Sequence, residues 1–586
     1  MSLELRRARN RQMVIFLLVC LGVVLMVGRL YYWQILQSYS GYDLVQRADA
    51  EHIQNQVVTA PRGLIYDDRG QLFATNVVRD DVYIEPIQFE VDHPDSDTFQ
   101  SNLRALVSSL HQVLPQVTEA ALTRDFDSGA ATVRIAEAIS PAQSQQLRAL
   151  RLPDIFLEPR TVRVYPGGDL AAQVLGFVQD GNGQGVYGIE QQYNTLLAGK
   201  SGSLTAETDL NGNPLTVGAS SRQPAINGAN LTLTIDSMMQ YFVQTGLDNA
   251  VQQMGAQSGT ALVVNARTGA IMAMAGSPSF DPNHYGDYAD LKGCLNSEDV
   301  YFDPALYCTY EPGSTMKAVT MAAALDQGVI TPDTSLYDPG YINFPDAPMV
   351  TNWENLGYGQ ETMTQVLEHS ANVGAAWVAH DKLGPERYYS YLARFGFGQP
   401  TGVGGTDEAS GDYRAPTSPD WTPSDLTRQS FGQSITATPL QVVMAYEAIA
   451  NSGNLMKPYL LASINNNGHV TTTRPQVQRR VISQRAAQQL TGMLVQDATV
   501  GLAKVVSLPG YSIAAKTGTA TTQGVSDTET EASVAGFLPA SNPQFVILVK
   551  LDRPQATIYG GTAAAPLWKA IAQQLMWYYN VPPDRQ

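Results

Sequence analysis

A serine and a lysine lie three positions apart at the start of an apolar run. Ser314 and Lys317 belong to "YEPGSTMKAVTMAAALDQG", Tyr310 to Gly328, in which a glycine ends the apolar stretch. Positions i and i+3 share one face of a helix, so the hydroxyl and the amine can meet there. The helix dipole and burial both disfavour an ammonium, which would let Lys317 take a proton from Ser314. A capping serine followed by a solvated lysine is the alternative.

Two other short motifs favour the catalytic interpretation. "HSANVG" places Ser370 and Asn372 two positions apart before an apolar run, and by itself it indicates another capping serine with a turn asparagine. "AAKTGTA" ends an apolar strand, and by itself it indicates a strand end with a glycine turn. In the order Ser-x-x-Lys, Ser-x-Asn, Lys-Thr-Gly, the three are the signature of the penicillin-binding proteins and serine β-lactamases. The third motif contributes Lys516, Thr517, Gly518 and Thr519.

Composition argues against several other classes of protein. The formal net charge is −17, and no basic patch offsets it, so a nucleic-acid-binding protein is not expected. The three cysteines form no Cys-x-x-Cys pair, and the seven histidines form no His-Glu-x-x-His motif. We therefore expect no metal site and no cofactor.

The N-terminus predicts a membrane anchor. Met13 to Trp33 is an apolar run that ends in an aromatic group, and it suits a bilayer span of about 20 residues. Four arginines precede it, so residues 1–12 are expected in the cytoplasm and the bulk of the chain outside. A cleaved signal peptide is less consistent with the sequence, because no Ala-x-Ala-like site follows the run. A buried core helix is the other alternative. The arginines are Arg6, Arg7, Arg9 and Arg11.

The outer portion divides near the linker-like stretch 217–230. We expect one domain over residues 34–228 and a second over 229–586. In the second, residues 237–254 have helical spacing, and short apolar strands occur near both of its ends. This arrangement predicts one α+β domain whose sheet draws on both ends of the segment.

The chain also resembles a known family over nearly its whole length. "APRGLIYDDRGQLFATN", "RVYPGGDLAAQVLGFV" and "GIEQQYNTLLAGKSG" resemble the N-terminal pedestal module of class B penicillin-binding proteins, which are membrane-anchored peptidoglycan D,D-transpeptidases. "FGQSITATPLQ" and "YGGTAAAPLW" resemble segments of their catalytic module. The resemblance implies an antiparallel five-stranded sheet flanked by helices. A single transmembrane helix and an elongated, mostly β pedestal would precede it.

The resemblance also implies a role for each motif residue. Ser314 would attack the penultimate D-Ala of a stem peptide and become acylated, with Lys317 as its base. Ser370 would relay a proton to the leaving amine, and Asn372 would contact the substrate amide. The Lys-Thr-Gly motif, with Lys516, would bind the terminal carboxylate. The N–H groups of Ser314 and Thr519 would form the oxyanion hole.

The family's substrates and partners are expected here as well. They are stem peptides ending in D-Ala-D-Ala, β-lactam antibiotics, the cytoplasmic membrane and a SEDS-family glycan polymerase. Asn372 at the third position of Ser-x-Asn resembles division-type rather than elongation-type members. A membrane-tethered β-lactamase or β-lactam sensor, and a D,D-carboxypeptidase, remain alternatives.

Cys294 and Cys308 bracket "GCLNSEDVYFDPALYC", a segment that is usually shorter in the family. Cys20 lies in the predicted span, so these two are the cysteines of the outer portion. Outside the cytoplasm a disulfide can persist, and we expect one here. Two buried free thiols are the alternative. Because Cys308 lies six residues before Ser314, a bridge would stiffen the entrance to the site.

Overall fold

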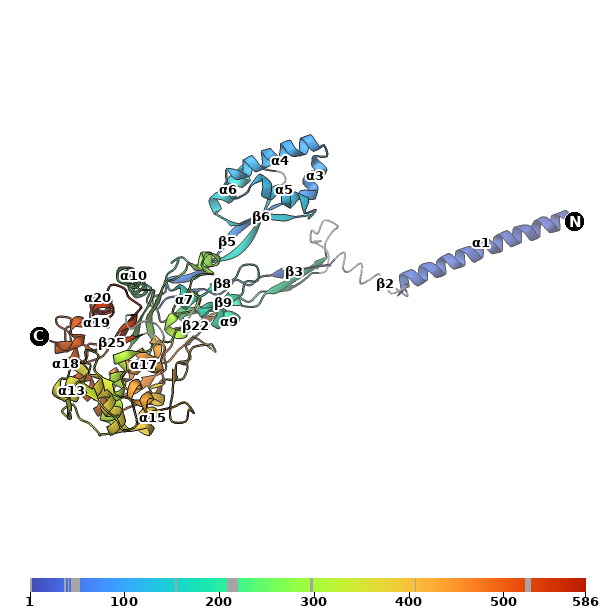
Figure 1. Ribbon diagram of the computed structural model, residues 1–586. Helices are drawn as coiled ribbons and strands as arrows, with labels where there is room; N and C mark the ends of the chain where they lie inside the picture. Colours follow the sequence, from blue (N-terminus) through green and yellow to red (C-terminus); the bar gives the residue numbers. More distant parts are fainter. Residues whose placement is uncertain are drawn as a thin grey trace. The chain divides into compact units, whose positions relative to one another are not determined.

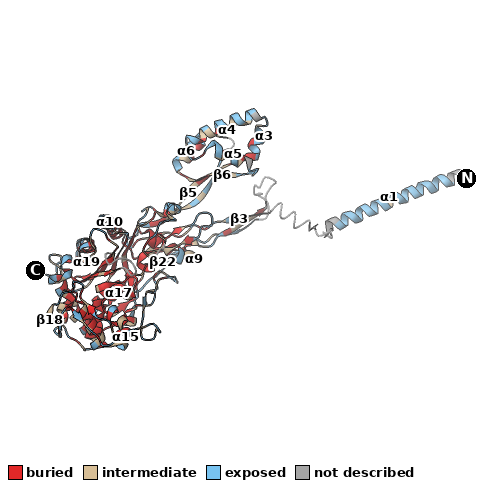
Figure 2. Ribbon diagram, viewed as in Figure 1, coloured by how far each residue is buried: buried red, intermediate tan, exposed pale blue. Residues whose placement is uncertain are grey.

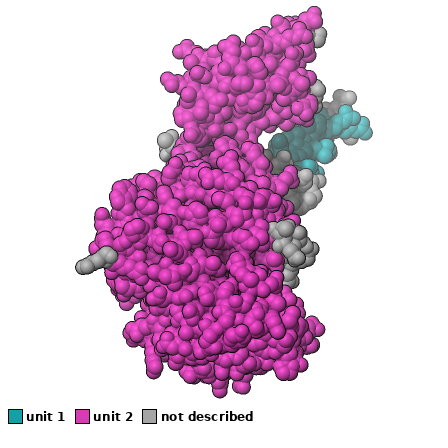
Figure 3. All heavy atoms as spheres, turned by 60° about the vertical axis from the view of Figure 1, so that its left-hand side comes forward, with its two compact units in different colours: residues 1–61, 199–227 teal, residues 62–198, 228–586 magenta. Residues whose placement is uncertain are grey.

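The computed structural model describes residues 3–35, 38–39, 42–43, 53–152, 155–207, 220–295, 299–405, 407–521 and 529–585. It divides into two compact units, which Figure 3 colours separately. One unit comprises residues 1–61 and 199–227, and the other comprises residues 62–198 and 228–586. Each unit therefore combines segments that are distant in the sequence.

The first unit begins with a long apolar helix, α1 (Leu3–Ile35), which contains the predicted span. The most apolar 18-residue window within Arg6–Tyr32 has a mean hydropathy of 2.7, and the apolar side chains of the helix are exposed, as Figure 2 shows. Among the described residues it is the one helix long and apolar enough to cross a membrane. The unit also contains a three-stranded antiparallel sheet, in the order β11-β10-β3. The strands are β3 (Ile53–Val58), β10 (Gly202–Glu207) and β11 (Ser220–Gln223); β1 (Ser38–Tyr39) pairs with β2 (Tyr42–Asp43). Strand β11 lies within the stretch predicted as a linker, and residues 217–219 of that stretch are outside the described residues.

The N-terminal part of the second unit contains more helix than the mostly β pedestal expected from the sequence. Four helices, α3 to α6, lie between residues 86 and 150. Leu103, Leu106 and Leu110 are spaced to form one face of a helix, and they pack in a separate core with Phe89 and Phe126. These helices accompany the strands of the segment that the resemblance implied to be mostly β. They are α3 (Pro86–Asp92), α4 (Ser96–His111), α5 (Glu119–Asp127) and α6 (Pro141–Leu150).

A seven-stranded sheet joins this part to the catalytic part of the same unit. Strand β12 pairs in parallel with β4 and antiparallel with β22, so it connects segments from three regions of the chain. The sheet order is β23-β22-β12-β4-β5-β6, and β7 pairs with β5. Its strands are β4 (Ile65–Tyr66), β5 (Leu72–Ile84), β6 (Val133–Ile139), β7 (Ile155–Val164), β12 (Asn230–Leu233), β22 (Leu461–Asn466) and β23 (His469–Thr472). Short elements follow β7: α7 (Ala172–Leu175), β8 (Phe177–Val178), β9 (Gly185–Val186), α8 (Gly188–Gln192) and α9 (Asn194–Ala198).

The central sheet has five antiparallel strands in the order β14-β13-β27-β26-β25, which confirms the predicted fold class. Two strands come from the start of the catalytic segment and three from its end, as expected. All residues of β26 and β27 are buried, because helices cover both faces. The strands are β13 (Ser258–Asn265), β14 (Ile271–Ser277), β25 (Ala514–Thr521), β26 (Thr530–Leu538) and β27 (Phe545–Asp552).

The alternation along β13 shows how the two faces form separate cores. Ala261 and Val263 pack in a core with α10 and α20, whereas Leu262 and Val264 pack in a core with α12, α17 and α18. Figure 1 labels α10, α17, α18 and α20 in this part of the chain. The second core carries the catalytic motifs. The main helices are α10 (Ser237–Met254), α12 (Met316–Asp326), α13 (Met363–Glu368), α14 (Asn372–Trp377), α15 (Pro385–Phe395), α16 (Pro423–Gln429), α17 (Pro439–Ala450), α18 (Gln484–Val500), α19 (Gly560–Ala563) and α20 (Ala565–Tyr578).

Shorter elements complete this unit. The helical turns are η1 (Pro282–Tyr288), α11 (Pro304–Tyr307), η2 (Gly313–Thr315), η3 (Val378–Leu383) and η4 (Leu502–Val506). Four strand pairs are β15 (Ser335–Asp338) with β18 (Gly359–Thr362), β16 (Tyr341–Ile342) with β17 (Val350–Thr351), β19 (Asp412–Tyr413) with β20 (Ile435–Thr436), and β21 (Asn454–Met456) with β24 (Val477–Arg480).

Candidate active site

Ser314 lies in η2, the turn of helix directly before α12, and packs beside the edge strand β25. Gly313 makes this approach possible. Its φ is +57°, and a Cβ there would lie 2.8 Å from the carbonyl oxygen of Thr519. Any other residue would therefore strain the turn and push the serine away from β25. The glycine before the serine thus brings the first motif against the third.

The Lys317 amine is the centre of the first two motifs. Its Nζ lies 3.0 Å from Ser314 Oγ and 3.1 Å from Ser370 Oγ. It also lies 2.5 Å from the Ser370 carbonyl oxygen and 2.8 Å from Asn372 Oδ1. A neutral amine has two N–H bonds, which suit the carbonyl and amide oxygens, and one lone pair, which remains for a hydroxyl. The geometry is therefore that of a base beside a serine, not of a solvated lysine.

The electrostatics around Lys317 favour the neutral amine. The side chain is fully buried, and burial lowers its pKa well below the ordinary value of 10.5. The charge of Lys516 lowers this pKa further, whereas Asp497 and Glu361 act in the opposite direction. Proton acceptance from Ser314 near neutral pH requires such a lowered pKa.

The second motif is held in an unusual backbone conformation. Ser370 has a φ of +55°, in the left-handed region that costs a non-glycine residue of order 1 kcal/mol. This conformation lies between α13 and α14 and directs both the carbonyl and the hydroxyl of Ser370 at Lys317. Asn372, the first residue of α14, donates from Nδ2 to the carbonyl of Thr351 at 3.1 Å.

A buried asparagine that the sequence analysis did not identify supports this motif. Asn352 accepts a hydrogen bond from the N–H of Val373 at 3.1 Å. Its amide donates to Asp338 Oδ2 at 2.7 Å and to the carbonyl of Leu356 at 3.0 Å. Asn352 and Asp338 are both buried. These contacts anchor Val373, the residue of α14 that directly follows Asn372.

The third motif presents hydroxyls, not its ammonium, to the cavity. Lys516 is fully buried, and its Nζ lies 3.3 Å from Asp497 Oδ2, also buried, on α18. Thr517 and Thr519 line the cavity. Gly518 faces the opposite way, since a Cβ there would lie 2.8 Å from the carbonyl of Pro312. The signal for Asp497 in the sequence is weak, because it is one acidic residue in an amphipathic helix.

The three motifs border one cavity of about 810 Å³. Ser314, Ser370, Asn372, Thr517 and Thr519 contribute polar groups to its lining. Two exposed aromatic residues also line it and contact each other, with ring centroids 5.6 Å apart. The cavity can hold a peptide-sized acyl donor above the serine. The aromatic residues are Trp353 and Tyr559.

The arrangement suits acyl transfer through a serine nucleophile. An amine with a lowered pKa contacts the hydroxyl, and the edge strand β25 has N–H groups that the sheet does not use. Among the described residues, no cluster of His, Cys, Asp and Glu could hold a metal ion. Five of the predicted site residues line this cavity, and Lys317 contacts one of them, Ser314. The five are Ser314, Ser370, Asn372, Thr517 and Thr519.

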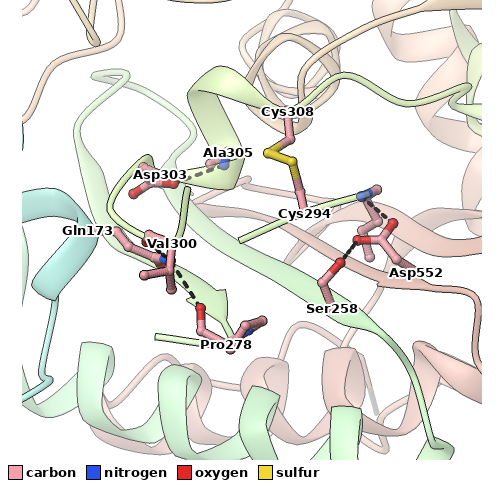
Figure 4. Close-up of a disulfide and its surroundings, with 10 residues drawn as sticks. Gln173, Ser258, Pro278, Cys294, Val300, Asp303, Ala305, Cys308 and Asp552 are labelled. Carbon is pink, nitrogen blue, oxygen red and sulfur yellow. Dashed lines mark hydrogen bonds and ion pairs between the residues drawn. A yellow bond between two sulfur atoms is a disulfide. The ribbon is translucent and has the colours of Figure 1, made fainter. Parts of the chain in front are cut away.

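The segment before the nucleophile is closed by a disulfide. The structure joins Cys294 to Cys308, with their Cα atoms 6.4 Å apart, and Figure 4 shows the bridge. Both cysteines are buried. Residues 296–298 of the predicted insertion lie outside the described residues.

Comparisons with known proteins agree with this geometry. Residues 259–573 match the penicillin-binding protein transpeptidase domain, and residues 57–233 match the penicillin-binding protein dimerisation domain. The chain is 34% identical to the penicillin-binding protein PbpB of Mycobacterium tuberculosis over 485 residues, covering 79% of this chain and 69% of the relative. It is 29% identical to the peptidoglycan D,D-transpeptidase FtsI of Escherichia coli K12, covering 97% and 92% of the two chains.

Solved structures give the same result. The crystal structure of penicillin-binding protein 3 from Mycobacterium tuberculosis with aztreonam has a TM-score of 0.67 and 28% identity to this chain, and covers 90% of this chain and 98% of its own. A peptidoglycan synthetase from Bifidobacterium adolescentis has a TM-score of 0.69 and 27% identity, covering 91% and 98%. With a transpeptidase domain over more than half its length and a dimerisation domain before it, the chain belongs to the class B penicillin-binding proteins.

Proposed function

We propose that this protein is a peptidoglycan D,D-transpeptidase that crosslinks stem peptides through an acyl-enzyme on Ser314. The observation that carries the proposal is the contact between Lys317 Nζ and Ser314 Oγ, 3.0 Å apart, where the pKa of Lys317 is strongly lowered. The names of the relatives support the same activity.

Acylation begins when Ser314 Oγ attacks the carbonyl of the penultimate D-Ala and its proton passes to Lys317. The oxyanion that forms is stabilised by the N–H groups of Ser314 and Thr519. The C–N bond to the terminal D-Ala then breaks, and Ser370, 3.1 Å from Lys317, relays the proton to the leaving amine. An amine of a second stem peptide attacks the ester, gives its proton back through the same groups, and releases Ser314. Asn372 holds the substrate amide.

Because Lys516 is buried behind β25, groups other than its ammonium contact the terminal carboxylate of the substrate. The hydroxyls of Thr517 and Thr519 line the cavity and are suited to contact the terminal carboxylate, with Gly518 allowing β25 to lie against the nucleophile turn. Lys516 contributes its charge from behind the strand. β-Lactams acylate Ser314 because they present the same acyl and carboxylate groups in a comparable arrangement.

A β-lactamase or β-lactam sensor is the alternative, and one observation disfavours the β-lactamase. Rapid deacylation needs a base for water, for which class A β-lactamases use a glutamate. No aspartate or glutamate lines the catalytic cavity among the residues that the structure describes. A D,D-carboxypeptidase, with water as acceptor, shares the remaining features.

The anchor supports a place in the cytoplasmic membrane. We propose a cytoplasmic tail over 1–12, a transmembrane helix over 13–33, a pedestal over 34–228 and the catalytic domain over 229–586, outside the membrane. The arginines before the apolar run support this orientation. The resemblance of Ser370 and Asn372 to the motif of division-type members favours a role in division, and a SEDS-family glycan polymerase is the proposed partner of the anchor and pedestal.

The test is labelling of the full chain in membranes with a fluorescent penicillin. Wild-type protein should form a stable adduct, and Ser314→Ala should form none while retaining the thermal transition of the wild type. Rapid turnover of nitrocefin by the wild type would favour a β-lactamase instead. An adduct that forms on Ser314→Ala at the normal rate would exclude Ser314 as the nucleophile.

A further inference from the structure

A buried glutamate on β18 lies close to the second catalytic motif, and the acylation steps above do not use it. The side chain of Glu361 is 1% exposed, and it does not line the catalytic cavity. Helix α13 follows β18 directly, and its end at Glu368 lies two residues before Ser370. Burial of an ionised carboxylate is costly unless the carboxylate is paired. The contacts of this side chain therefore have to account for its position.

One oxygen of Glu361 holds the residue directly before Ser370. Its Oε2 lies 3.1 Å from Nδ1 of His369, which suits a ring N–H that donates to the carboxyl group. The ring also stacks on Tyr358, with centroids 4.4 Å apart and planes 22° apart. Ser370 is the residue with the left-handed backbone, and its oxygens contact Lys317. Glu361 and Tyr358 therefore restrain the chain on the N-terminal side of this strained residue.

The carboxyl group of Asp338 lies beside that of Glu361. In the β15–β18 pair, Leu336 is opposite Glu361 and Asp338 is opposite Gly359. Opposite residues of an antiparallel pair share a face of the sheet, and so do residues two apart on one strand. Asp338 is therefore the diagonal neighbour of Glu361 on the same face, within reach of a long side chain. Both side chains are buried on that face.

Asp338 connects Glu361 to the other side of the motif. Its Oδ2 accepts from the Asn352 amide at 2.7 Å, and its Oδ1 accepts from the N–H of Gly340 at 2.6 Å. Asn352 in turn accepts from the N–H of Val373, in the first turn of α14. The pair of carboxyl groups therefore holds the chain on both sides of the second motif.

The two carboxyl groups fit together when they share one proton. Glu361 Oε1 is buried and has no hydrogen-bond partner among the described residues. Two ionised carboxylates this close repel each other, whereas a neutral acid donates its O–H to the other group. Burial, followed by the charge and the hydrogen bond of Asp338, raises the pKa of Glu361 to about 8, and the charge of Lys317 opposes this only in part. Glu361 is therefore mostly the neutral acid at pH 7, and Oε1 is the oxygen on which its proton fits.

The neutral acid also preserves the base. The charge of an ionised Glu361 raises the pKa of Lys317. A higher pKa favours the ammonium, which cannot accept the proton of Ser314. A neutral group at the same place leaves the lowered pKa of Lys317 undisturbed. The contacts of Glu361 and its protonation therefore favour the same catalytic state.

We propose that Glu361 is a positioning residue for acyl transfer. As the neutral acid it donates to Asp338 and accepts from His369, and these two contacts hold the Ser370–Asn372 motif against Lys317 from both sides. This role rests on the proposed acylation of Ser314. It adds a residue that acts through the second motif from outside the lining of the catalytic cavity.

Acylation should weaken as Glu361 ionises. When the pH rises through about 8, Glu361 loses its proton, the two carboxylates repel each other, and the new charge acts on Lys317. The contribution to stability has the same direction. Because the folded pKa lies above the ordinary value of 4.5, the stabilisation is complete below pH 4.5 and is lost as the pH rises through about 8. The titratable groups that face Glu361 are Asp338, Lys317, His369 and Tyr358, and Lys516 and Asp497 face Lys317.

The experiment measures acylation of the full chain in detergent micelles by a fluorescent penicillin, from about pH 6 to about pH 9.5. Glu361→Gln imitates the neutral acid, because its amide N–H can donate to Asp338 and its carbonyl can accept from His369. Glu361→Leu has a similar volume and makes neither bond. Asp303→Asn is the matched control. Asp303 is also buried, with its pKa raised to about 7, it does not line the catalytic cavity, and asparagine keeps its cap on the N–H of Ala305.

At pH 7 we expect Glu361→Gln to acylate within about twofold of the wild-type rate, and Glu361→Leu to be at least about tenfold slower in protein that retains a cooperative thermal transition. Between about pH 7 and about pH 9.5 the wild type and Asp303→Asn should lose at least about threefold in rate, whereas Glu361→Gln should lose less than about twofold. The melting temperature of the wild type should fall with rising pH more steeply than that of Glu361→Gln.

The proposal would be overturned if folded Glu361→Leu acylated at the wild-type rate, or if Glu361→Gln were as slow as Glu361→Leu at pH 7. It would also be overturned if the wild type showed no alkaline decline, or if the same decline persisted in Glu361→Gln. If Glu361→Leu does not fold, the profiles of the wild type and Glu361→Gln decide alone. Failure of the wild type to form any adduct would overturn the proposed function as well, so the two failures are distinguishable.

Discussion

Replacing Asn352 with leucine should disrupt the active site without touching its nucleophile. Leucine has a similar volume, but it removes three hydrogen bonds: from Val373 N–H, to Asp338 Oδ2 and to the Leu356 carbonyl. Losing each neutral bond costs about 1 kcal/mol, and losing the bond to a carboxylate costs about 2 kcal/mol. The total expected loss of stability is therefore about 4 kcal/mol.

The same change should slow acylation, because Val373 follows Asn372 at the start of α14. When this turn is free to move, the Ser370 and Asn372 oxygens no longer hold Lys317 beside Ser314. A displacement of about 1 Å in a catalytic group can reduce a rate about a hundredfold. We expect the second-order acylation rate with a fluorescent penicillin to fall by a factor of about 10 to 100.

A matched variant separates positioning from stability. Asn283 also makes two backbone bonds, at 2.9 Å and 3.0 Å, to the N–H and carbonyl of Tyr165, and it does not line the catalytic cavity. Asn283→Leu should lower the melting temperature and leave the acylation rate of the folded protein unchanged. The melting temperature is measured by thermal denaturation, and the acylation rate is measured from labelling reactions stopped at defined times. If Asn352→Leu acylates at the wild-type rate, Asn352 does not position the second motif.

Further predictions concern the base, the disulfide and the anchor. Lys317→Ala should reduce penicillin labelling nearly to background in folded protein. Because the pKa of Lys317 lies well below 10.5, wild-type acylation should not require a pH near 10.5, and it should decline as a falling pH protonates this amine. Reduction of Cys294–Cys308 should lower the stability by about 3 kcal/mol, as expected for a loop of about 15 residues, and slow acylation; two alkylated thiols on unreduced, exported protein would contradict this. Protease added to spheroplasts should digest residues 34–586. Full protection of this portion from the protease would contradict the proposed orientation.

Much of this molecule follows from local sequence pattern. The α1 helix, the β13–β14 hairpin and the strands β25 to β27 are each specified by a continuous run of apolar residues between turn signals. The order of the three motifs was enough to identify the candidate site. The chemical types and the spacing of the motif residues are visible in the sequence, so the site could be identified without knowledge of any tertiary contact.

Tertiary structure decided which residues support those motifs. Asn352 bonds to Val373, which lies 21 positions later in the sequence. Asp497 on α18 pairs with Lys516 on β25. A single polar residue in a loop or a helix forms no repeating sequence pattern. Its partner can therefore be identified only in the folded structure. The burial of Lys516 behind β25 depends in the same way on helix α18 packing against the sheet.

The buried surroundings of Asp303 show the same limit most clearly. The sequence determined that two cysteines bracket an acidic, aromatic insertion. It could not determine that Tyr307 of this insertion would bond to the carbonyl of Gly404, or that Asp303 Oδ2 would be buried without a hydrogen-bond partner among the described residues. That outcome depends on packing among segments distant in the sequence, because burial and hydrogen-bond satisfaction are properties of the assembled fold.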